Sequence, residues 1–159
     1  MNAVHIRPAT ISDVPAIANF IRKLAEYEKL SHAVNVTDDL LRQHLFGAKP
    51  AAEVLMAELD GREIGYALFF QTYSTFVGRP GIWLEDLFVL PQYRGKGAGK
   101  ALLTAVARIA AQRNCGRLEW SVLDWNSPAI EFYKSVGAFP LDDWTIFRMT
   151  GEKLNDYLR

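Results

Sequence analysis

The sequence contains a single cysteine and no surplus of charge, and each of these absences excludes a class of protein. With Cys115 alone among 159 residues, no intramolecular disulfide can form, and a reducing, cytoplasmic setting is expected. We interpret Cys115 as a small, half-buried side chain rather than a catalytic thiol. The 18 basic side chains balance 18 acidic ones, so no basic bias points to nucleic acid or to anionic lipid.

Long hydrophobic runs and metal-ligand spacings are missing as well. No apolar stretch approaches the roughly 20 residues that a membrane-spanning helix needs, and the polar N-terminus does not resemble a signal peptide. His5, His32 and His44 are dispersed along the chain, so we predict no metal site. The length instead predicts one soluble domain with a single core, spanning residues 1–159.

What is present is a mixed pattern of helices and strands. Hydrophobic periodicity and turn residues predict the order β-α-α-β-β-β-α-β-α-β-β, an α/β chain with antiparallel strands early and a strand–helix–strand crossover later. The predicted strands are 4–7, 54–59, 64–73, 82–90, 117–123, 139–141 and 145–150. The predicted helices begin after Ser12 or Asp13, after Thr37, at the turn 94–99 and at Ser127, with a last helical turn at 151–158. Asp60-Gly61 marks a tight hairpin, and Gly65 marks a bulge.

A glycine-rich turn, Arg94-Gly95-Lys96-Gly97-Ala98-Gly99, lies between a predicted strand and a predicted helix. Glycines let the backbone approach a ligand closely, and the free N–H groups at the start of the next helix point toward that ligand. With the charges of Arg94 and Lys96, these groups predict an anion site suited to a pyrophosphate. The alternative is a flexible glycine loop without a ligand.

Two other phosphate motifs fail at specific positions of this turn. A P-loop needs a glycine where Arg94 stands and a hydroxyl residue after Lys100, where Ala101 stands. A dinucleotide fingerprint needs a third glycine, at position 100 or 102, where Lys100 and Leu102 stand. The turn instead matches Arg-x-x-Gly-x-Gly, and in this it resembles the pyrophosphate loop of the GNAT acetyltransferases, which bind acetyl-CoA.

Other segments extend this resemblance over nearly the whole chain. They are Ile6–Thr10, Leu24–Glu28, Trp83–Val89 with Tyr93–Gly95, and Trp125–Lys134 with Gly137-Ala138. Together they are similar to the spermidine/spermine (diamine) N-acetyltransferases and their thialysine-acetylating relatives. The resemblance implies the GNAT fold, a V-shaped splayed mixed sheet of about seven strands flanked by four helices.

The resemblance also implies where acetyl-CoA binds. The cosubstrate would enter between strands 82–90 and 117–123, with its pantetheine arm added to an exposed strand edge. The residues implied to contact it are Leu87, Phe88, Val89, Arg94, Gly95, Lys96, Gly97, Ala98, Gly99, Lys100, Asn126, Ala129 and Tyr133.

Acetyl transfer to an amine needs a base for the ammonium proton, donors for the tetrahedral intermediate and an acid for the departing thiolate. Tyr133 matches the family's catalytic tyrosine and is the implied general acid; an amphipathic core tyrosine is the alternative. Glu85 is the candidate general base, acting through water. In a regular strand its neighbour Asp86 points to the opposite face, and a bulge would change that. A pair of structural carboxylates is the alternative for both.

A cationic acceptor also needs negative charge around it. By resemblance to the diamine enzymes, the implied substrate-binding residues are Tyr27, Glu28, Glu85, Asp86, Glu119 and Asp143, with Asp142 as the other choice for the last. Two segments are shorter than in the better-known eukaryotic members: the hairpin at Asp60-Gly61 and the stretch between Ala138 and Trp144. The shorter stretch affects the register of Asp142 and Asp143, and with it polyamine specificity.

The sequence therefore predicts an N-acetyltransferase for the primary amine of a diamine, a polyamine or a lysine-like molecule such as thialysine. The alternatives are a peptide or protein N-acetyltransferase and a non-catalytic acyl-CoA-binding module, which would need neither Tyr133 nor Glu85. The resemblance also implies a homodimer, with the strand Trp144–Thr150 at its interface. Neither nucleic acid nor a membrane is expected as a partner.

Overall fold

The computed structural model describes residues 3–159, and the chain divides into two compact units after Ser121. The first unit holds a mixed sheet with helices packed on it, and the second holds residues 122–159. Each unit is described by itself. The expectation that residues 1–159 form a single domain stays a prediction.

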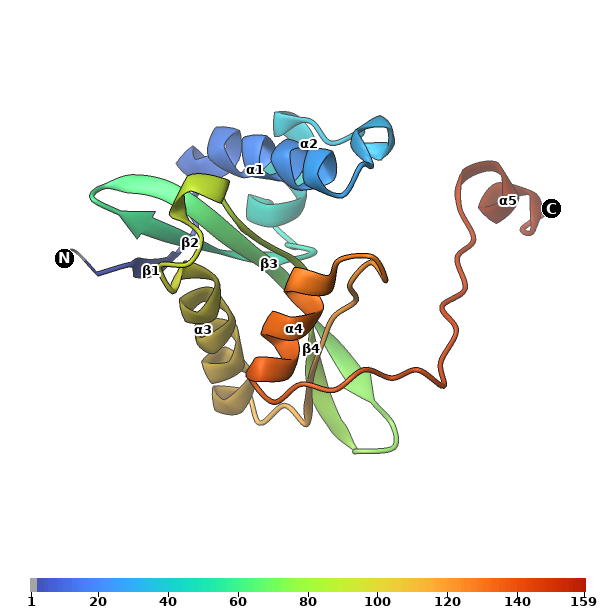
Figure 1. The fold of residues 1–159 in the computed structure, drawn as a ribbon. Helices are drawn as coiled ribbons and strands as arrows, with labels where there is room; N and C mark the ends of the chain where they lie inside the picture. Colours follow the sequence, from blue (N-terminus) through green and yellow to red (C-terminus); the bar gives the residue numbers. More distant parts are fainter. Residues whose placement is uncertain (1–2) are drawn as a thin grey trace. The chain divides into compact units, whose positions relative to one another are not determined.

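Strands of the first unit form one sheet in the spatial order β1-β2-β3-β4-β5 (Figure 1). Their bounds are β1 His5–Pro8, β2 Glu53–Leu59, β3 Arg62–Ser74, β4 Arg79–Val89 and β5 Arg117–Glu119. Neighbours from β1 to β4 run antiparallel, whereas β5 runs parallel to β4. This is the mixed α/β sheet that the predicted order of elements indicates.

Helices cover both faces of this sheet. They are α1 Val14–Tyr27, α2 Asp38–Phe46 and α3 Ala98–Gln112, with short 3-10 turns at Ile11–Asp13, Ser31–Ala33 and Pro91–Tyr93. In Figure 1, α1 and α2 lie on one face and α3 on the other. A buried apolar cluster joins α1 and α2 to the sheet through residues such as Ile17, Phe20, Leu41, Met56, Tyr66 and Phe88. Burial of this cluster holds α1 and α2 on the sheet. None of the helices in residues 3–159 has the length and apolar character that crossing a membrane requires.

Two glycine positions explain the shape of the β2–β3 hairpin. Asp60 and Gly61 both have positive φ, 54° and 73°, as a tight hairpin turn of this kind demands. The register shifts beside Gly65, because Ala57 pairs with Gly65 while Glu58 pairs with Glu63. A Cβ at Gly65 would collide with the carbonyl oxygen of Phe88 on β4. The predicted turn and the predicted bulge are both confirmed.

The end of the chain differs from the prediction. In the second unit, helices α4 (Ser127–Ser135) and α5 (Gly151–Asp156) form as expected, but residues 3–159 contain no strand at 139–141 or at 145–150. The sheet therefore has five strands rather than about seven, and β5 ends at Glu119 rather than at residue 123. The reason is that strand-forming side chains do not make a strand without a backbone partner. The large side chains here are exposed instead, with Phe147 at 92%.

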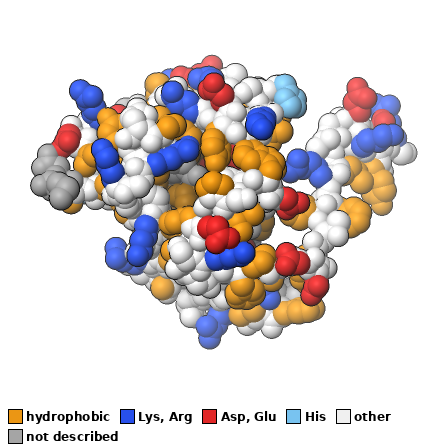
Figure 2. Space-filling model, viewed as in Figure 1, with side chains coloured by type: hydrophobic (Ala, Val, Ile, Leu, Met, Phe, Trp, Pro, Cys, Tyr) orange, Lys and Arg blue, Asp and Glu red, His pale blue; other side chains and the backbone are white. Residues whose placement is uncertain are grey.

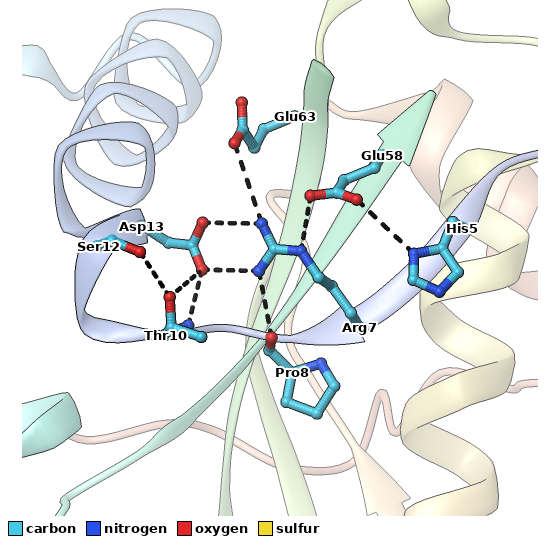
Figure 3. Close-up of polar contacts among 8 residues, drawn as sticks. All are labelled: His5, Arg7, Pro8, Thr10, Ser12, Asp13, Glu58 and Glu63. Carbon is cyan, nitrogen blue, oxygen red and sulfur yellow. Dashed lines mark hydrogen bonds and ion pairs between the residues drawn. The ribbon is translucent and has the colours of Figure 1, made fainter. Parts of the chain in front are cut away.

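A network of charges around Arg7 ties β1 to the start of α1 and to β2 (Figure 3). The Arg7 guanidinium donates to both Asp13 carboxylate oxygens at 2.7 and 2.9 Å, and its Nε donates to Glu58 at 2.6 Å. Asp13, which is only 5% exposed, also accepts from the Thr10 N–H at 2.7 Å. The hydrogen bonds from Arg7 hold the pKa of Asp13 below its usual value despite burial. The charge of Arg7 compensates that of Asp13, so this carboxylate stabilises the fold.

Candidate functional site

The glycine-rich turn leads directly into the N-terminus of α3. Gly95 and Gly97 have φ values of 73° and 85°, in the left-handed region where side chains other than glycine are strained. Gly97 is the N-cap, and among the described residues no side chain caps the helix. The first turn of α3 therefore presents free N–H groups, beginning at Ala98, to whatever lies in front of it. This geometry suits an anion.

Basic side chains surround this helix start. The Lys96 ammonium lies 5.5 Å from the centre of the Tyr93 ring. A shallow depression begins at Gly97 and continues along α3 past Lys100, Thr104 and Arg108, which recur every four residues and so share one face. On the face drawn in Figure 2, Lys and Arg side chains are otherwise scattered among acidic and apolar ones rather than gathered in a broad field.

Arg94 connects this turn to the end of α1. Its Nε donates to the carbonyl oxygen of Val89 at 2.9 Å, so one of its donors is used within the protein. Its guanidinium carbon lies 4.8 Å from the centre of the Tyr27 ring and 5.6 Å from that of Phe88. The contact with Tyr27 brings Arg94, a predicted pyrophosphate residue, next to a predicted substrate-binding residue.

A bulge in β4 decides where its two carboxylates point. Leu68 of β3 pairs with Asp86, and the next residue, Phe69, pairs with Leu84, so Glu85 is the extra residue. Asp86 shares the face of Leu68, and Glu85, which follows Leu84, turns to that same face.

A hydrogen bond from Trp83 supports this placement of Glu85. Trp83 pairs with Phe70, which shares the Leu68 face by alternation along β3, and its indole N–H donates to Glu85 at 2.8 Å. A regular strand would have separated Glu85 and Asp86, and the bulge puts them together.

Asp86 lies under the end of α1 beside a tyrosine that the sequence analysis did not select. The Tyr66 hydroxyl donates to Asp86 at 2.7 Å. Burial raises the pKa of Asp86, the hydrogen bond from Tyr66 opposes that rise, and the nearby charge of Glu85 adds to it. Burial, followed by the charge of Asp86, also raises the pKa of Glu28. In residues 3–159, none of Glu28, Glu85 and Asp86 forms an ion pair with Lys or Arg.

The structure thus brings Tyr27, Glu28, Glu85 and Asp86 together from distant parts of the chain. Tyr66 could have been noticed from the sequence, because a tyrosine within an apolar strand needs a partner for its hydroxyl. That signal identifies a buried hydrogen bond but not its acceptor, which lies 20 residues away.

Next to these carboxylates, the edge of β4 has no paired strand within residues 3–159. The ladder between β4 and β5 covers Gly81 to Trp83 on β4 and ends at the pair Trp83–Glu119. Leu87, Phe88 and Val89 lie beyond it and pair with β3 on their other side. Glu119 itself is half-buried at the end of β5. Beyond this point, β4 offers backbone groups to an added strand-like ligand.

The remaining predicted residues belong to the second unit. Asn126 is buried and caps α4, accepting from the Ala129 N–H at 3.4 Å. Tyr133 is half-buried in α4, with its ring 5.3 Å from that of Phe132. Asp142 and Asp143 are exposed in a segment without helix or strand. Their roles, like those of the residues in the first unit, stay predictions.

Comparison with known proteins decides the family. The profile of the acetyltransferase (GNAT) family matches residues 19–138, which is most of the chain. The chain belongs to the GNAT acetyltransferase family. This confirms the resemblance seen in the sequence, and with it the mixed α/β fold and an acetyl-transferring activity.

Relatives of this GNAT protein include enzymes named for small amines. It is 39% identical to the thialysine N-epsilon-acetyltransferase of Mus musculus, over 98% of both chains. It is 34% identical to an L-ornithine N5-acetyltransferase of Arabidopsis thaliana, over 94% of this chain and 85% of that one. A solved integron cassette protein from V. cholerae matches its fold with a TM-score of 0.82 and 26% identity, covering 98% of each chain.

Within residues 3–159, no three or more His, Cys, Asp or Glu side chains gather in a way that could hold a metal ion.

Proposed function

We propose that this GNAT protein transfers the acetyl group of acetyl-CoA to the primary amine of a small molecule, either a diamine or polyamine or a lysine-like amine such as thialysine. The observation that carries the proposal is the pair of carboxylates on one face of β4, which have no basic partner within residues 3–159 and lie next to the part of the β4 edge beyond its ladder with β5. The names of the curated relatives support the same substrate class.

The donor side fits the residues present. The uncapped start of α3, with left-handed glycines at 95 and 97, has the free N–H groups that a pyrophosphate needs. Lys96 and Lys100 add positive charge to this end, and Arg108 lies further along the same face of α3. Leu87 to Val89 would hold the pantetheine arm along the open edge of β4, and Asn126 and Ala129 would contact the same ligand. Bound acetyl-CoA would supply an activated acetyl thioester.

The acceptor side is suited to a cation. Burial disfavours the ionised forms of Glu28 and Asp86; the charge of Asp86 adds to this effect at Glu28, and the charge of Glu85 adds to it at Asp86. A bound ammonium group would compensate both charges at once, which makes them a favourable place for an amine. Tyr27, Glu119 and Asp143 are proposed as further contacts of the acceptor. A free amine fits the acidic cluster of Glu28, Glu85 and Asp86 in the first unit, whereas a peptide acceptor also needs an open groove.

Two side chains are proposed to move protons. Glu85 is exposed on the same face as Asp86, so it can take a proton from the acceptor ammonium through a water molecule. The freed nitrogen lone pair then attacks the acetyl carbonyl carbon to form the C–N bond. Collapse of the tetrahedral intermediate breaks the C–S bond, and the nitrogen gives its second proton to water. The Tyr133 hydroxyl gives a proton to the departing sulfur, and bulk water restores it. No metal takes part in this proposal.

The test is a thiol-release assay with acetyl-CoA and a panel of acceptors: a diamine, spermidine, thialysine, ornithine, lysine and a peptide with a free N-terminus. We expect turnover with at least one small amine and little with the peptide. Turnover with the peptide alone would replace the proposal with a peptide N-acetyltransferase. Tight CoA binding without turnover on any amine would indicate a non-catalytic acyl-CoA-binding module.

A substitution at Tyr133 tests its proposed role as the general acid. Tyr133→Phe should keep its affinity for CoA and lose about 100-fold or more in turnover, the usual range for general acid catalysis. A fully active Tyr133→Phe protein would remove Tyr133 from this role.

A cytoplasmic homodimer is part of the proposal. The exposed apolar side chains of residues 144–150, including Trp144, Ile146 and Phe147, support an interface there, because large exposed apolar patches mark interaction sites. Analytical ultracentrifugation tests this, and a monomer at micromolar concentration would contradict it.

A further inference from the structure

The hydroxyl of Tyr66 occupies one fixed position beneath the amine site. Tyr66 is 0% exposed, and its ring stacks on Phe20 of α1, with 5.7 Å between centroids and an angle of 16° between planes. Phe20 in turn packs against Phe88 of β4, with 6.0 Å between centroids. A ring held between a helix and a sheet cannot turn away without opening the core, so its hydroxyl is a preset donor.

The sheet register explains why this donor meets Asp86. Tyr66 pairs with Phe88 and Leu68 pairs with Asp86, so Tyr66 and Asp86 are diagonal neighbours on one face of adjacent strands. Their atoms meet at 2.7 Å, and within residues 3–159 this is the only side-chain hydrogen bond of Asp86. The other side of the Asp86 carboxylate is therefore left for another group.

We propose that Tyr66 is a positioning residue of the amine site: its hydroxyl holds the Asp86 carboxylate in place and ionised, so that Asp86 and Glu28 together bind one ammonium group of the acceptor. The inference rests on the proposed function. It adds a residue from the core of the sheet to the machinery that selects a cationic acceptor.

Several groups determine the charge state of Asp86. Tyr66 on β3 favours the ionised form, and burial opposes it. Glu85 on β4 and Glu28 at the end of α1 add negative charge on the same side. Arg94 lies over Tyr27 and Phe88, and β5 carries Glu119 opposite Trp83. The neutral phenol is the donor here, because burial and then the charge of Asp86 raise the pKa of Tyr66 well above its ordinary value.

Tyr66→Phe removes the hydroxyl and keeps the ring. We expect the KM for the amine to rise about tenfold, since a hydrogen bond to a charged group is lost, while the KM for acetyl-CoA stays unchanged. The hydrogen bond lowers the pKa of Asp86, so its removal raises that pKa. The acid limb of kcat/KM for the amine should therefore move to higher pH.

Tyr73→Phe is the matched control. It removes a hydroxyl from the same strand, at a side chain that is 67% exposed. Both KM values and the pH profile should stay as in the parent protein. Equal effects of the two variants would overturn the inference.

Asp86→Asn tests whether Tyr66 acts through Asp86. The amide keeps an oxygen for the Tyr66 hydroxyl but carries no charge. Asp86→Asn alone should raise the KM for the amine, and adding Tyr66→Phe should change it little further. Two independent, additive effects would contradict a positioning role for Tyr66.

A measurement on the parent protein covers the case in which Tyr66→Phe does not fold. The six tyrosines are labelled with carbon-13 at Cζ, and the Tyr66 signal is followed by NMR during titration with the best amine of the panel. A shift that is lost in Asp86→Asn supports the inference, and no shift at saturating amine overturns it. If the parent protein acetylates no amine, the proposed function and this inference both fail. If it is active and Tyr66→Phe is unchanged, the inference alone fails.

Discussion

Asp13 and Asp86 are both carboxylates that the fold of the first unit shields from solvent, yet their surroundings shift their pKa values in opposite directions. Arg7 holds Asp13 with two short hydrogen bonds, and the pKa of Asp13 falls (Figure 3). Burial raises the pKa of Asp86 and the charge of Glu85 adds to the rise, which the hydrogen bond from the neutral Tyr66 phenol only opposes. A compensated carboxylate stabilises the fold, whereas a carboxylate without a basic partner, as Asp86 is within residues 3–159, keeps affinity for a cation.

Glu85→Gln should have the largest effect and tests the uncompensated region. Loss of a general base costs about 100-fold or more in turnover. The exposed position of Glu85 means that the free energy of unfolding should change little. Steady-state rates across pH, together with urea unfolding, check both expectations. A variant with an unchanged pH profile would clear Glu85 of the role of base.

Arg7→Ala tests the compensated region. It leaves Asp13 buried without its partner, and we expect a loss of about 3 kcal/mol in the free energy of unfolding, as for other broken buried pairs. Urea unfolding measures it. Arg42→Ala is the control, because it breaks an exposed pair with Asp39 and should cost less than about 1 kcal/mol. Similar losses in the two variants would show that the Arg7–Asp13 pair stabilises the fold no more than an exposed ion pair does.

The contributions of Asp13 and Asp86 to the free energy of unfolding should change in opposite directions as the pH rises. The folded-state pKa of Asp13 lies below its unfolded value, so its contribution is present near neutral pH and is lost as the pH falls through the folded pKa. Asp86 has a raised folded-state pKa, so it costs stability as the pH rises above its unfolded value. Unfolding of the parent and of each Asp→Asn variant across pH 3 to 7 (roughly the range in which carboxylates titrate) measures both.

Two matched substitutions, Asp13→Asn and Asp86→Asn, should change the free energy of unfolding least at neutral pH, and in opposite directions. Asp13→Asn should lower the free energy of unfolding by about 1–3 kcal/mol, since the charge-assisted hydrogen bonds of Arg7 are weakened. Asp86→Asn should raise it by about 0.5–1 kcal/mol, as substitutions that relieve a local cost commonly do. If both variants are destabilised equally, the contrast between the two regions is wrong.

Much of the local structure could be predicted from the sequence. Thr37 caps α2 by accepting from the Leu40 N–H at 3.2 Å, Gly47 ends that helix, and Asp60-Gly61 turns the β2–β3 hairpin. Each of these depends on residues a few positions apart. Backbone preferences and short-range hydrogen bonds act over that distance, so a single sequence carries the information.

The two missing strands show where this reasoning ends. Residues 139–141 and 145–150 are rich in apolar and aromatic side chains of the kind found in strands, yet they form no strand in the described chain. A strand needs a neighbour with free backbone groups in register, and nothing in a local pattern supplies that neighbour.

The candidate site also contains residues that the sequence predicts and one that only the structure reveals. The glycine turn, Glu28, Glu85 and Asp86 could be selected from motifs, but Tyr66 was missed because its partner lies 20 residues away. Cross-strand pairing decides which side chains meet, and pairing depends on the bulges of both strands.

By itself, the sequence determined the family, the order of the elements up to α4, and the positive-φ glycines that shape the start of α3. Only the tertiary structure decided that Glu85 and Asp86 share one face, that Tyr66 supports Asp86, and that Arg94 lies over Tyr27. The physical reason is the range of the interactions involved. Backbone conformation follows from neighbouring residues, whereas a one-residue bulge between β3 and β4 redirects side chains and reassigns every contact on that face.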